Sequence, residues 1–316
     1  MNIDFVGKRK WFYIFSSALI LISVVSFFTK GFQQDIEFSG GTVIDINLPV
    51  AVNNNDVEAL VRQYAPNSEP RIQKSDKIDE NGRIVSSGVS ISCNALEEEQ
   101  KNNIITAIGE KYEVENIEEL ATFRTVKPTF GTEMKNRAIK ATVLAVIAII
   151  IYIALAFRKV GGISAGVTAT LALCHDLIIM IAVYSLCGLP LNTTFVAALL
   201  TILGYSVNDT VVIYDRIREN KNLHRKMEDK ELINLSINQS LRRTIFTSIS
   251  VTVALAIIFG FSTYFKVTTM QRFALPLLVG MVIGTYTSIC LASNLWYDWR
   301  RISDQNAKNK RVAKKA

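Results

Sequence analysis

The chain of 316 residues has a mean hydropathy of +0.25, with 49% hydrophobic and 20% charged residues. This composition is too apolar for an ordinary soluble domain of that length. The net charge of +7 does not indicate nucleic-acid binding, because the lysines and arginines gather at the ends of apolar segments, where they set topology and contact anionic membrane lipids. We therefore predict a membrane protein with no nucleic-acid partner.

Six apolar windows reach or approach the roughly 20 residues that a helix needs to cross a bilayer core of about 30 Å. They are Trp11–Phe28, Ile139–Phe157, Ile163–Cys187, Thr193–Ile213, Thr244–Phe261 and Phe273–Trp296. No small-residue cleavage site follows the first window. Residues 1–30 are therefore predicted to form a cytoplasmic N-terminus and a retained first span.

The polar stretch between the first two windows, residues 31–137, is predicted to form a separate domain. It contains 18 of the 28 acidic residues of the chain but only 11 of the 35 basic residues. The rest of the chain holds the other 10 acidic and 24 basic residues. Lysine and arginine near span ends stay cytoplasmic, so this domain is expected outside and both termini inside the cytoplasmic membrane. Residues 138–299 would hold the other five spans and a cytoplasmic loop at 216–243, followed by a basic cytoplasmic tail at 300–316.

The sequence of the acidic domain predicts strands and helices in the order β-α-β-β-α-β. The predicted elements are a strand Thr42–Leu48, a helix Asp56–Tyr64, a hairpin of Arg71–Lys77 and Ile84–Cys93 around residues 79–82, a helix Ala95–Tyr112 and a strand Ile117–Val126. Asn94 and Glu97 have the spacing of a capping box for the second helix. This order is typical of the ferredoxin-like fold, so the predicted class is an α-helical polytopic membrane protein with an α+β ferredoxin-like extracytoplasmic domain.

Small residues recur every four positions in two spans. The runs are Gly162, Gly166, Thr170, Cys174 and Gly280, Gly284, Ser288, Ala292. Small residues at this spacing let helix backbones approach closely in lipid, so the four glycines are predicted to mark helix-packing seams. The charged segment Leu223–Leu241 is interpreted either as an amphipathic segment on the inner membrane face or as a plain solvated helix.

Three ionisable side chains lie well inside the predicted spans: His175, Asp176 and Asp209. A charge at that depth costs at least about 2.5–3.5 kcal/mol, so such groups are usually functional. Asp209 is predicted to be functional, on a polar stripe that includes Thr201, Tyr205 and Asn208. His175 and Asp176 point about 100° apart on a helix, so each is expected to need a partner on another helix, in a coupling or a structural role.

Arg243 begins the fifth predicted span. An arginine there is commonly a snorkelling anchor, although its long side chain can also reach toward Asp209. The chain has no P-loop motif, no nucleophile–histidine constellation and no metal-ligand spacing such as CxxC. We therefore predict no enzymatic activity, no cofactor and no metal. Any energy coupling would come from an ion gradient, of H⁺ or of Na⁺.

Five segments together resemble the SecF family, whose members are membrane subunits of the bacterial Sec protein-export machinery and belong to the RND superfamily. The segments are IEFSGGT at Ile36–Thr42, LCHD at Leu173–Asp176, GYSVNDTVVIYDRIREN at Gly204–Asn220, SLRRTIFTS at Ser240–Ser248 and LVGMVIGTYTSICLA at Leu278–Ala292. The first includes Phe38, Gly40 and Gly41, and has Glu37 where the family more often has Asp.

The resemblance implies that Asp209 is a proton-linked carboxylate and that Arg243 is functionally linked to it. It also implies SecD as a second six-span half, the SecYEG channel and possibly YajC as further partners, and an unfolded polypeptide as substrate. Two alternatives stay open. The first is a proton-driven exporter of small molecules or lipids, and the second is a scaffold of the translocation channel that transports nothing itself.

Overall fold

The computed structural model describes residues 3–66, 68, 70–78, 84–158, 161–265 and 267–313. Contacts divide the chain into two compact units: residues 1–33 together with 140–316, and residues 34–139. The first unit is helical, and the second combines helices with a sheet.

Among the described residues, six helices are long and apolar enough to cross a membrane, which confirms the six predicted spans. Their segments are α1 (Arg9–Lys30), α6 (Pro128–Ala156), α7 (Gly162–Leu186), α8 (Thr193–Leu223), α9 (Asp229–Tyr264) and a last span made of α10 (Thr268–Thr287), a π-helical turn (Ser288–Ala292) and α11 (Ser293–Ala313). The described part of the predicted tail, residues 300–313, continues α11 as helix.

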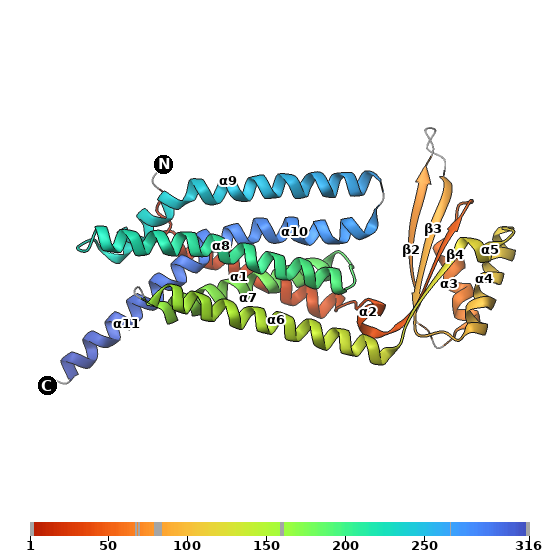
Figure 1. The fold of residues 1–316 in the computed structure, drawn as a ribbon, viewed down its shortest axis with the longest axis horizontal. Coiled ribbons are helices and arrows are strands. Elements are labelled where there is room, and N and C mark those ends of the chain that lie inside the picture. The colour runs from red at the N-terminus through yellow and green to blue at the C-terminus, as the bar shows by residue number, and fades with distance from the viewer. Residues whose placement is uncertain are drawn as a thin grey trace. The chain divides into compact units, whose positions relative to one another are not determined.

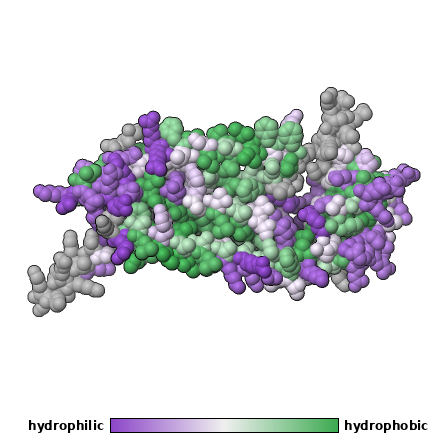
Figure 2. All heavy atoms as spheres, viewed as in Figure 1, coloured by the Kyte–Doolittle hydropathy of each residue, from purple (hydrophilic) through white to green (hydrophobic). Residues whose placement is uncertain are grey.

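The helical unit buries its spans unequally. About half or more of α7, α8 and the last span is buried, against 6% of α6 and 11% of α9 in their most apolar windows. In Figure 1, α10 runs between α9 and α8, and the α8–α9 turn lies at the same end of this unit as both described chain ends. Figure 2 shows an apolar surface over these helices. Most of α6 and α9 is therefore free to contact lipid or another protein.

The predicted cytoplasmic loop at 216–243 is helical apart from a short turn, because α8 continues to Leu223 and α9 begins at Asp229. Both interpretations of Leu223–Leu241 are wrong for most of its apolar residues. Leu232 and Ile237 are 2% and 0% exposed and belong to the main core of the unit. The apolar face of this segment is covered by the protein itself rather than by lipid or water.

Two asparagines hold the N-terminal segment against α9. Asn238 Oδ1 accepts a hydrogen bond from Ile3 N at 2.9 Å, and Asn238 Nδ2 donates to Ile3 O at 2.8 Å. Asn234 Oδ1 accepts from Phe5 N at 2.8 Å, and the Phe5 side chain is buried in the core. The amide of Asn238 thus pairs with the backbone of Ile3 as a neighbouring strand would.

Replacing Asn238 by alanine should destabilise this unit by about 1–3 kcal/mol, because two partly buried backbone groups of Ile3 lose their partner. Hydrogen exchange at the Ile3 amide measures the release of the segment and should accelerate. Asn222→Ala is the matched control, since Asn222 is exposed near the end of α8 and should leave this exchange unchanged. Equal protection of Ile3 in both variants would contradict this role of Asn238.

The second unit contains a four-stranded antiparallel sheet in the order β2-β3-β1-β4. Its elements are α2 (Ile36–Ser39), β1 (Gly41–Leu48), α3 (Asn54–Tyr64), β2 (Arg71–Ile78), β3 (Ile84–Cys93), α4 (Glu98–Tyr112), α5 (Ile117–Leu120) and β4 (Ala121–Val126). Helices α3, α4 and α5 lie on one side of the sheet in Figure 1. The predicted order of strands and main helices is found, while the predicted turn at 79–82 lies outside the described residues.

The core of this unit lies between the central strands and the helices. Ile44 pairs with Ile91 and Ile46 with Val89, and all four side chains are at most 2% exposed. These positions alternate along the strands because successive side chains point to opposite faces of a sheet. The helices complete the core with Val57, Val61, Ile104 and Ile108.

The second main helix begins three residues later than predicted, so the proposed capping box of Asn94 and Glu97 is wrong. Glu97 is itself the N-cap, and its N–H donates to Gln100 Oε1 at 3.1 Å to form the capping box. The reason is Leu96, which is buried and donates its backbone N–H to Thr42 Oγ1 at 3.1 Å. This contact ties the chain before Glu97 to β1.

The last strand is shorter than the predicted Ile117–Val126, because residues Ile117–Leu120 form one helical turn. Asn116 precedes this turn with a φ of 55°. Ile117 is buried against Gly109 of α4, where an added Cβ would lie only 3.0 Å from Ile117 Cγ2. Packing on the helix layer therefore keeps Ile117 out of the sheet.

Cys93 at the end of β3 is 6% exposed, and burial raises the pKa of its thiol to about 11. The thiolate is the reactive form, so at neutral pH Cys93 should alkylate far more slowly than the exposed Cys187. Because the folded state favours the protonated thiol, the raised pKa stabilises the fold fully below about pH 9. This stabilisation is lost as the pH rises through about 11. Mass spectrometry of labelled peptides measures both rates, and equal rates would contradict the prediction.

Candidate functional site

Asp209 lies in α8 with 2% of its side chain exposed. Its contact with a neighbouring helix is the Ser248 hydroxyl of α9, at 3.4 Å from Asp209 Oδ2. That hydroxyl also lies 2.8 Å from the backbone oxygen of Thr244, and its single hydrogen can satisfy one acceptor at a time. The carboxyl group of Asp209 is thus deeply buried and has little hydrogen-bond support for a negative charge.

Ser248 joins Asp209 to two further hydroxyls. Tyr205 of α8 donates to Ser248 Oγ at 3.3 Å, and Thr285 of α10 approaches it at 2.7 Å. The hydroxyl of Thr244 is buried one helical turn from Ser248 and has no hydrogen-bond partner among the described residues. Three helices, α8, α9 and α10, therefore contribute polar groups around one buried carboxyl group.

Arg243 does not form a direct ion pair with Asp209. Among the described residues, no nitrogen of Arg243 lies within 4.0 Å of a carboxylate oxygen of Asp209. Arg243 is close enough to act on Asp209 electrostatically. Its exposed side chain lines a shallow surface groove of about 460 Å³ with Gln239, Arg242 and Phe246. The Arg243 side chain is long enough to extend to Asp209, but it does not do so in this structure.

The predicted polar stripe on α8 divides into two faces. Tyr205 joins the Asp209 network, whereas Thr201 and Asn208 lie on the exposed side of the helix. The Thr201 hydroxyl donates to Ala197 O at 2.8 Å, within the same helix. The Asn208 side chain has no hydrogen-bond partner in the part of the chain that the structure describes. An amide exposed on a membrane span requires a partner, because lipid offers none.

His175 and Asp176 lie in the middle of α7 and are 3% and 1% exposed. The expectation that each needs a partner on another helix holds for Asp176 but not for His175, whose partner among the described residues is Asp176 itself, with Nδ1 3.3 Å from Oδ1. Side-chain rotation about Cβ reduces the separation that the backbone imposes on adjacent helical residues. Asp176 Oδ2 also accepts hydrogen bonds from Ser206 of α8 at 2.9 Å and from Thr287 of α10 at 3.0 Å.

The glycines of α7 lie against α6. A Cβ added at Gly162 would lie 2.2 Å from the backbone oxygen of Ala154, a distance that only movement of the backbone could relieve. At Gly166 the nearest atom would be Ile150 O at 3.4 Å, which is ordinary contact. The two helices therefore approach most closely at Gly162.

The glycines of α10 lie against α8. A Cβ at Gly280 would lie 2.2 Å from Ile202 Cδ1, the far end of a flexible side chain, and one at Gly284 would lie 3.2 Å from Ser206 Cβ. Gly284 thus brings α10 close to Ser206, where Thr287 shares the carboxylate of Asp176. The close approach of α10 and α8 and the second polar cluster occupy the same region.

Phe38, Gly40 and Gly41 lie in the second unit at a crossing of chain segments, where the start of β1 passes the start of α6 and the end of β3. Gly40 and Gly41 have φ values of 74° and 144°, which side chains rarely adopt. A Cβ at Gly40 would lie 2.6 Å from Pro128 Cα, and one at Gly41 would lie 2.4 Å from Cys93 O. The start of β1 therefore passes directly against the start of α6 and the end of β3. Phe38 is buried beside this crossing.

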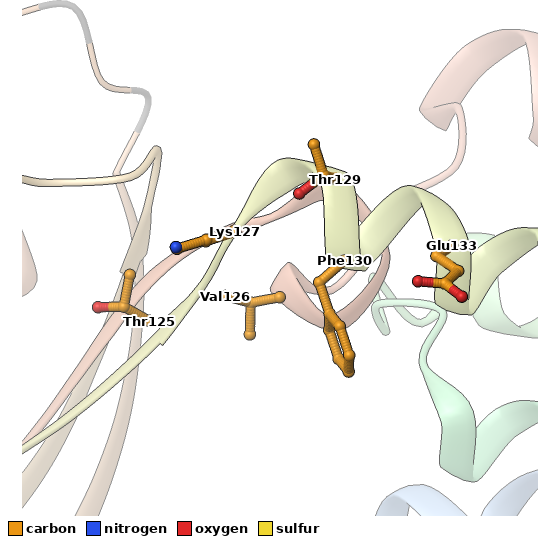
Figure 3. A pocket seen from close by; sticks show the side chains of 6 residues that line it. All are labelled: Thr125, Val126, Lys127, Thr129, Phe130 and Glu133. Carbon is orange, nitrogen blue, oxygen red and sulfur yellow. The ribbon is translucent and has the colours of Figure 1, made fainter.

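Next to the crossing, the end of β4 and the start of α6 line a shallow groove of about 470 Å³ (Figure 3). Its lining residues are Thr125, Val126, Lys127, Thr129, Phe130 and Glu133. Figure 3 shows Lys127 and Glu133 on opposite sides of Phe130. The two charged groups of the groove do not converge, so it offers no arrangement for acid–base chemistry. No pattern in the sequence indicated this groove.

Sequence reasoning missed the hydroxyls that surround the buried carboxyl groups: Ser206, Ser248, Thr285 and Thr287. Their signal is weak, because serine and threonine commonly bond to the carbonyl four residues earlier in a helix. Ser248 and Thr287 make that local bond as well. Their second partners depend on how the helices pack, which spacing along one helix does not reveal.

The fold and the site define a multi-pass membrane protein of the transport class. The described part of the chain has six helices that can span a membrane, a small domain with a four-stranded sheet, and carboxyl groups buried between the spans. Residues 105–302 match the family described as "Protein export membrane protein SecD/SecF, C-terminal". The "Protein translocase subunit SecF" of Calditerrivibrio nitroreducens is 38% identical over 94% of this chain and 93% of its own. That of Petrotoga mobilis is 35% identical over 92% and 94%.

The chain therefore belongs to the SecF family of protein translocase subunits. A solved structure agrees: SecDF of Thermus thermophilus, described as a translocon-associated membrane protein, superposes with a TM-score of 0.80 at 30% identity. The superposition covers 95% of this chain and 39% of the Thermus chain, so the chain spans less than half the length of that protein.

Proposed function

We propose that this chain is the SecF half of a complex that uses the proton-motive force, together with SecD, to promote polypeptide export across the bacterial cytoplasmic membrane. The observation that carries the proposal is Asp209, a carboxyl group 2% exposed at the meeting point of α8, α9 and α10. Burial of an ionisable group in a membrane span is costly and is typical of proton pathways. The family membership supplies protein export as the process that the proton would drive.

The exposed side of α8 supports a second membrane half as partner. Asn208 presents an unbonded amide there, and Thr201 lies on the same side. Both would meet lipid if the chain stood alone, and an unsatisfied polar group in lipid costs several kcal/mol. The Thermus SecDF chain, of which this chain spans 39%, is long enough to hold such a half. We assign SecD to this face.

The proposed cycle depends on the charge of Asp209. When deprotonated, Asp209 attracts Arg243 on the neighbouring helix, and when protonated it no longer does. The change in attraction shifts α9 relative to α8, and Ser248 and Thr285 transmit the shift to α10. The absence of a direct ion pair between Asp209 and Arg243 supports the protonated arm of this cycle, in which the attraction is lost. Movement of the spans then drives the outer domain to hold or release an unfolded polypeptide.

The charge distribution supports the orientation of the chain in the membrane. The excess of basic residues outside residues 31–137 favours both termini in the cytoplasm and the acidic unit outside. The strand order β2-β3-β1-β4 supports a ferredoxin-like fold for that unit. SecYEG and YajC are the further partners we assign, with anionic lipid at the cytoplasmic surface.

Export of an unfolded polypeptide by vesicles that contain this chain, SecD and the channel tests the proposal. Export should increase when a proton gradient is imposed and return to its basal level when a protonophore collapses the gradient. A sodium gradient at constant pH should have no effect. Stimulation by sodium alone would assign a different ion. Unchanged polypeptide export in all three conditions would leave a scaffold role. If cells that lack this chain lost small-molecule export while protein secretion stayed normal, this would indicate the exporter.

A further inference from the structure

A second polar cluster, formed by His175, Asp176, Ser206 and Thr287, takes no part in the cycle described above. Both titratable members are at least 97% buried, and three helices, α7, α8 and α10, supply the cluster. Asp176 Oδ1 faces His175 Nδ1 at 3.3 Å, while Oδ2 receives the two hydroxyls at 2.9 and 3.0 Å. Every oxygen of the carboxyl group therefore has a partner that can respond to a proton.

The surroundings of Asp176 contain no fixed compensating charge. Among the described residues, His175 is the titratable group in contact with it. Five other titratable groups within the helices packed against α7 bond elsewhere: Tyr13, Tyr205, Asp209, Tyr214 and Tyr286. Cys290 is a further titratable group there, and it is buried. The charged residues of α1, α10 and α11 lie toward the ends of their spans. An isolated carboxylate at this depth is costly, so the pair is favoured with one added proton and no net charge.

Thr287 can accommodate either form of Asp176. Its hydroxyl lies 3.0 Å from Asp176 Oδ2, 3.0 Å from Gly284 O and 3.1 Å from Ile283 O, and it has one hydrogen to donate. Beside a carboxylate, that hydrogen points to Oδ2. Beside a carboxylic acid with its proton on Oδ2, it turns to a backbone oxygen, and Thr287 Oγ1 accepts that proton. The carboxyl group of Asp176 thus keeps its hydrogen-bond partners in either protonation state.

His175 provides the point at which a proton enters the cluster. Its Nε2 atom is buried and has no hydrogen-bond partner among the described residues. A neutral ring that donates from Nδ1 to Asp176 keeps Nε2 as an open acceptor. A proton that adds to Nε2 is balanced by transfer of the Nδ1 proton to Asp176 Oδ1. The products are a neutral imidazole of the other tautomer and a neutral carboxylic acid with its proton on Oδ1. Thr287 keeps its bond to Oδ2 in that form, and it turns only when the acid proton lies on Oδ2.

The cluster shares two helices with the Asp209 site. On α8, Ser206 contacts Asp176 and its neighbour Tyr205 contacts Ser248. On α10, Thr287 contacts Asp176, and Thr285, two residues earlier, contacts Ser248. A change of hydrogen bonding at one carboxyl group therefore acts on the same two helices that hold the other.

We propose that His175 and Asp176 form a second intramembrane proton-binding site, with Thr287 as its switching hydroxyl, packed against the Asp209 site through α8 and α10. The proposal deepens the proposed function, because it adds a site to the same ion-driven complex. It rests on that function, but its test is separate, since binding of a proton at Asp176 can be observed without export.

Infrared difference spectroscopy of the complex in lipid vesicles tests this, because the C=O stretch of a protonated buried carboxyl group appears separately from that of a carboxylate. A pH titration should show two such bands that shift in D2O, one lost in Asp176→Asn and the other in Asp209→Asn. Thr287→Val should move the Asp176 band to a different frequency, and Thr287→Ser should restore it. Sodium at constant pH should change neither band.

A titration in which the Asp176→Asn spectrum equals that of the unchanged complex would overturn the proposal. So would an Asp176 band that responds to sodium rather than to pH. If the unchanged complex showed the Asp176 band but no Asp209 band, this would contradict the proposed function while leaving the second site in place. Each variant is first shown to co-purify with SecD. Should Asp176→Asn fail to assemble, the comparison of Thr287→Val with Thr287→Ser tests the site, and equal band frequencies in these two variants would overturn the proposal.

Discussion

Replacing Asp209 by asparagine should reduce export in vesicles to the level measured without a proton gradient, while basal export continues. Asparagine has nearly the same shape and still accepts a hydrogen bond from Ser248, so the packing of α8 against α9 is preserved. What it removes is the ability to bind and release a proton at a site that is 2% exposed. Without a change of charge at this position, the attraction between residue 209 and Arg243 stays the same when the gradient is imposed.

The matched control is Asp215→Asn, the same chemical change six residues later on α8. Asp215 is exposed and forms an ion pair with Arg218, and a surface pair of this kind contributes at most about 1 kcal/mol. Its replacement should leave stimulation by the gradient intact. Comparing both variants in one preparation, with assembly checked by co-purification with SecD, separates loss of coupling from loss of protein. Normal stimulation in Asp209→Asn would remove Asp209 from the mechanism.

The sequence was sufficient for features that depend on composition and on spacing along one element. The six spans follow from apolar length, and the order of strands and main helices in the second unit follows from alternation and turn residues. The burial of Asp209 was expected from the same reasoning, because a carboxyl group in a span faces protein or water. In each case a single segment contains the information.

Features that depend on contacts between segments could not be predicted. The start of α4 is decided by the bond from Leu96 to Thr42, and the shortened β4 by Ile117 packing on Gly109. The apolar side of the segment after Leu223 is covered by residues far away in the sequence, which spacing cannot indicate. The contact between His175 and Asp176 depends on side-chain torsions, which the angle between adjacent helical positions leaves undetermined.

Replacing Gly41 by alanine should destabilise the second unit by about 3 kcal/mol, the largest stability effect that we expect from one methyl group in this chain. The backbone at φ 144° is strained for any residue with a Cβ, which costs about 1–3 kcal/mol. The added atom would also lie 2.4 Å from Cys93 O, and relief of such overpacking costs a further 1–3 kcal/mol or so. Because the clashing atom belongs to the backbone of β3, the strand itself must move.

Cys93 can report this movement, because it pairs with Thr42 next to the altered residue and is 6% exposed. If opening precedes alkylation, a loss of about 3 kcal/mol should accelerate labelling of Cys93 on the order of a hundredfold. Gly31→Ala is the matched control: its φ is 65°, but nothing lies within 4 Å of the added Cβ, so it introduces strain without a clash. Equal, slow labelling of Cys93 in both variants would show that β1 and β3 tolerate the methyl group, and the conformation of Gly41 would then not be what holds the two strands together.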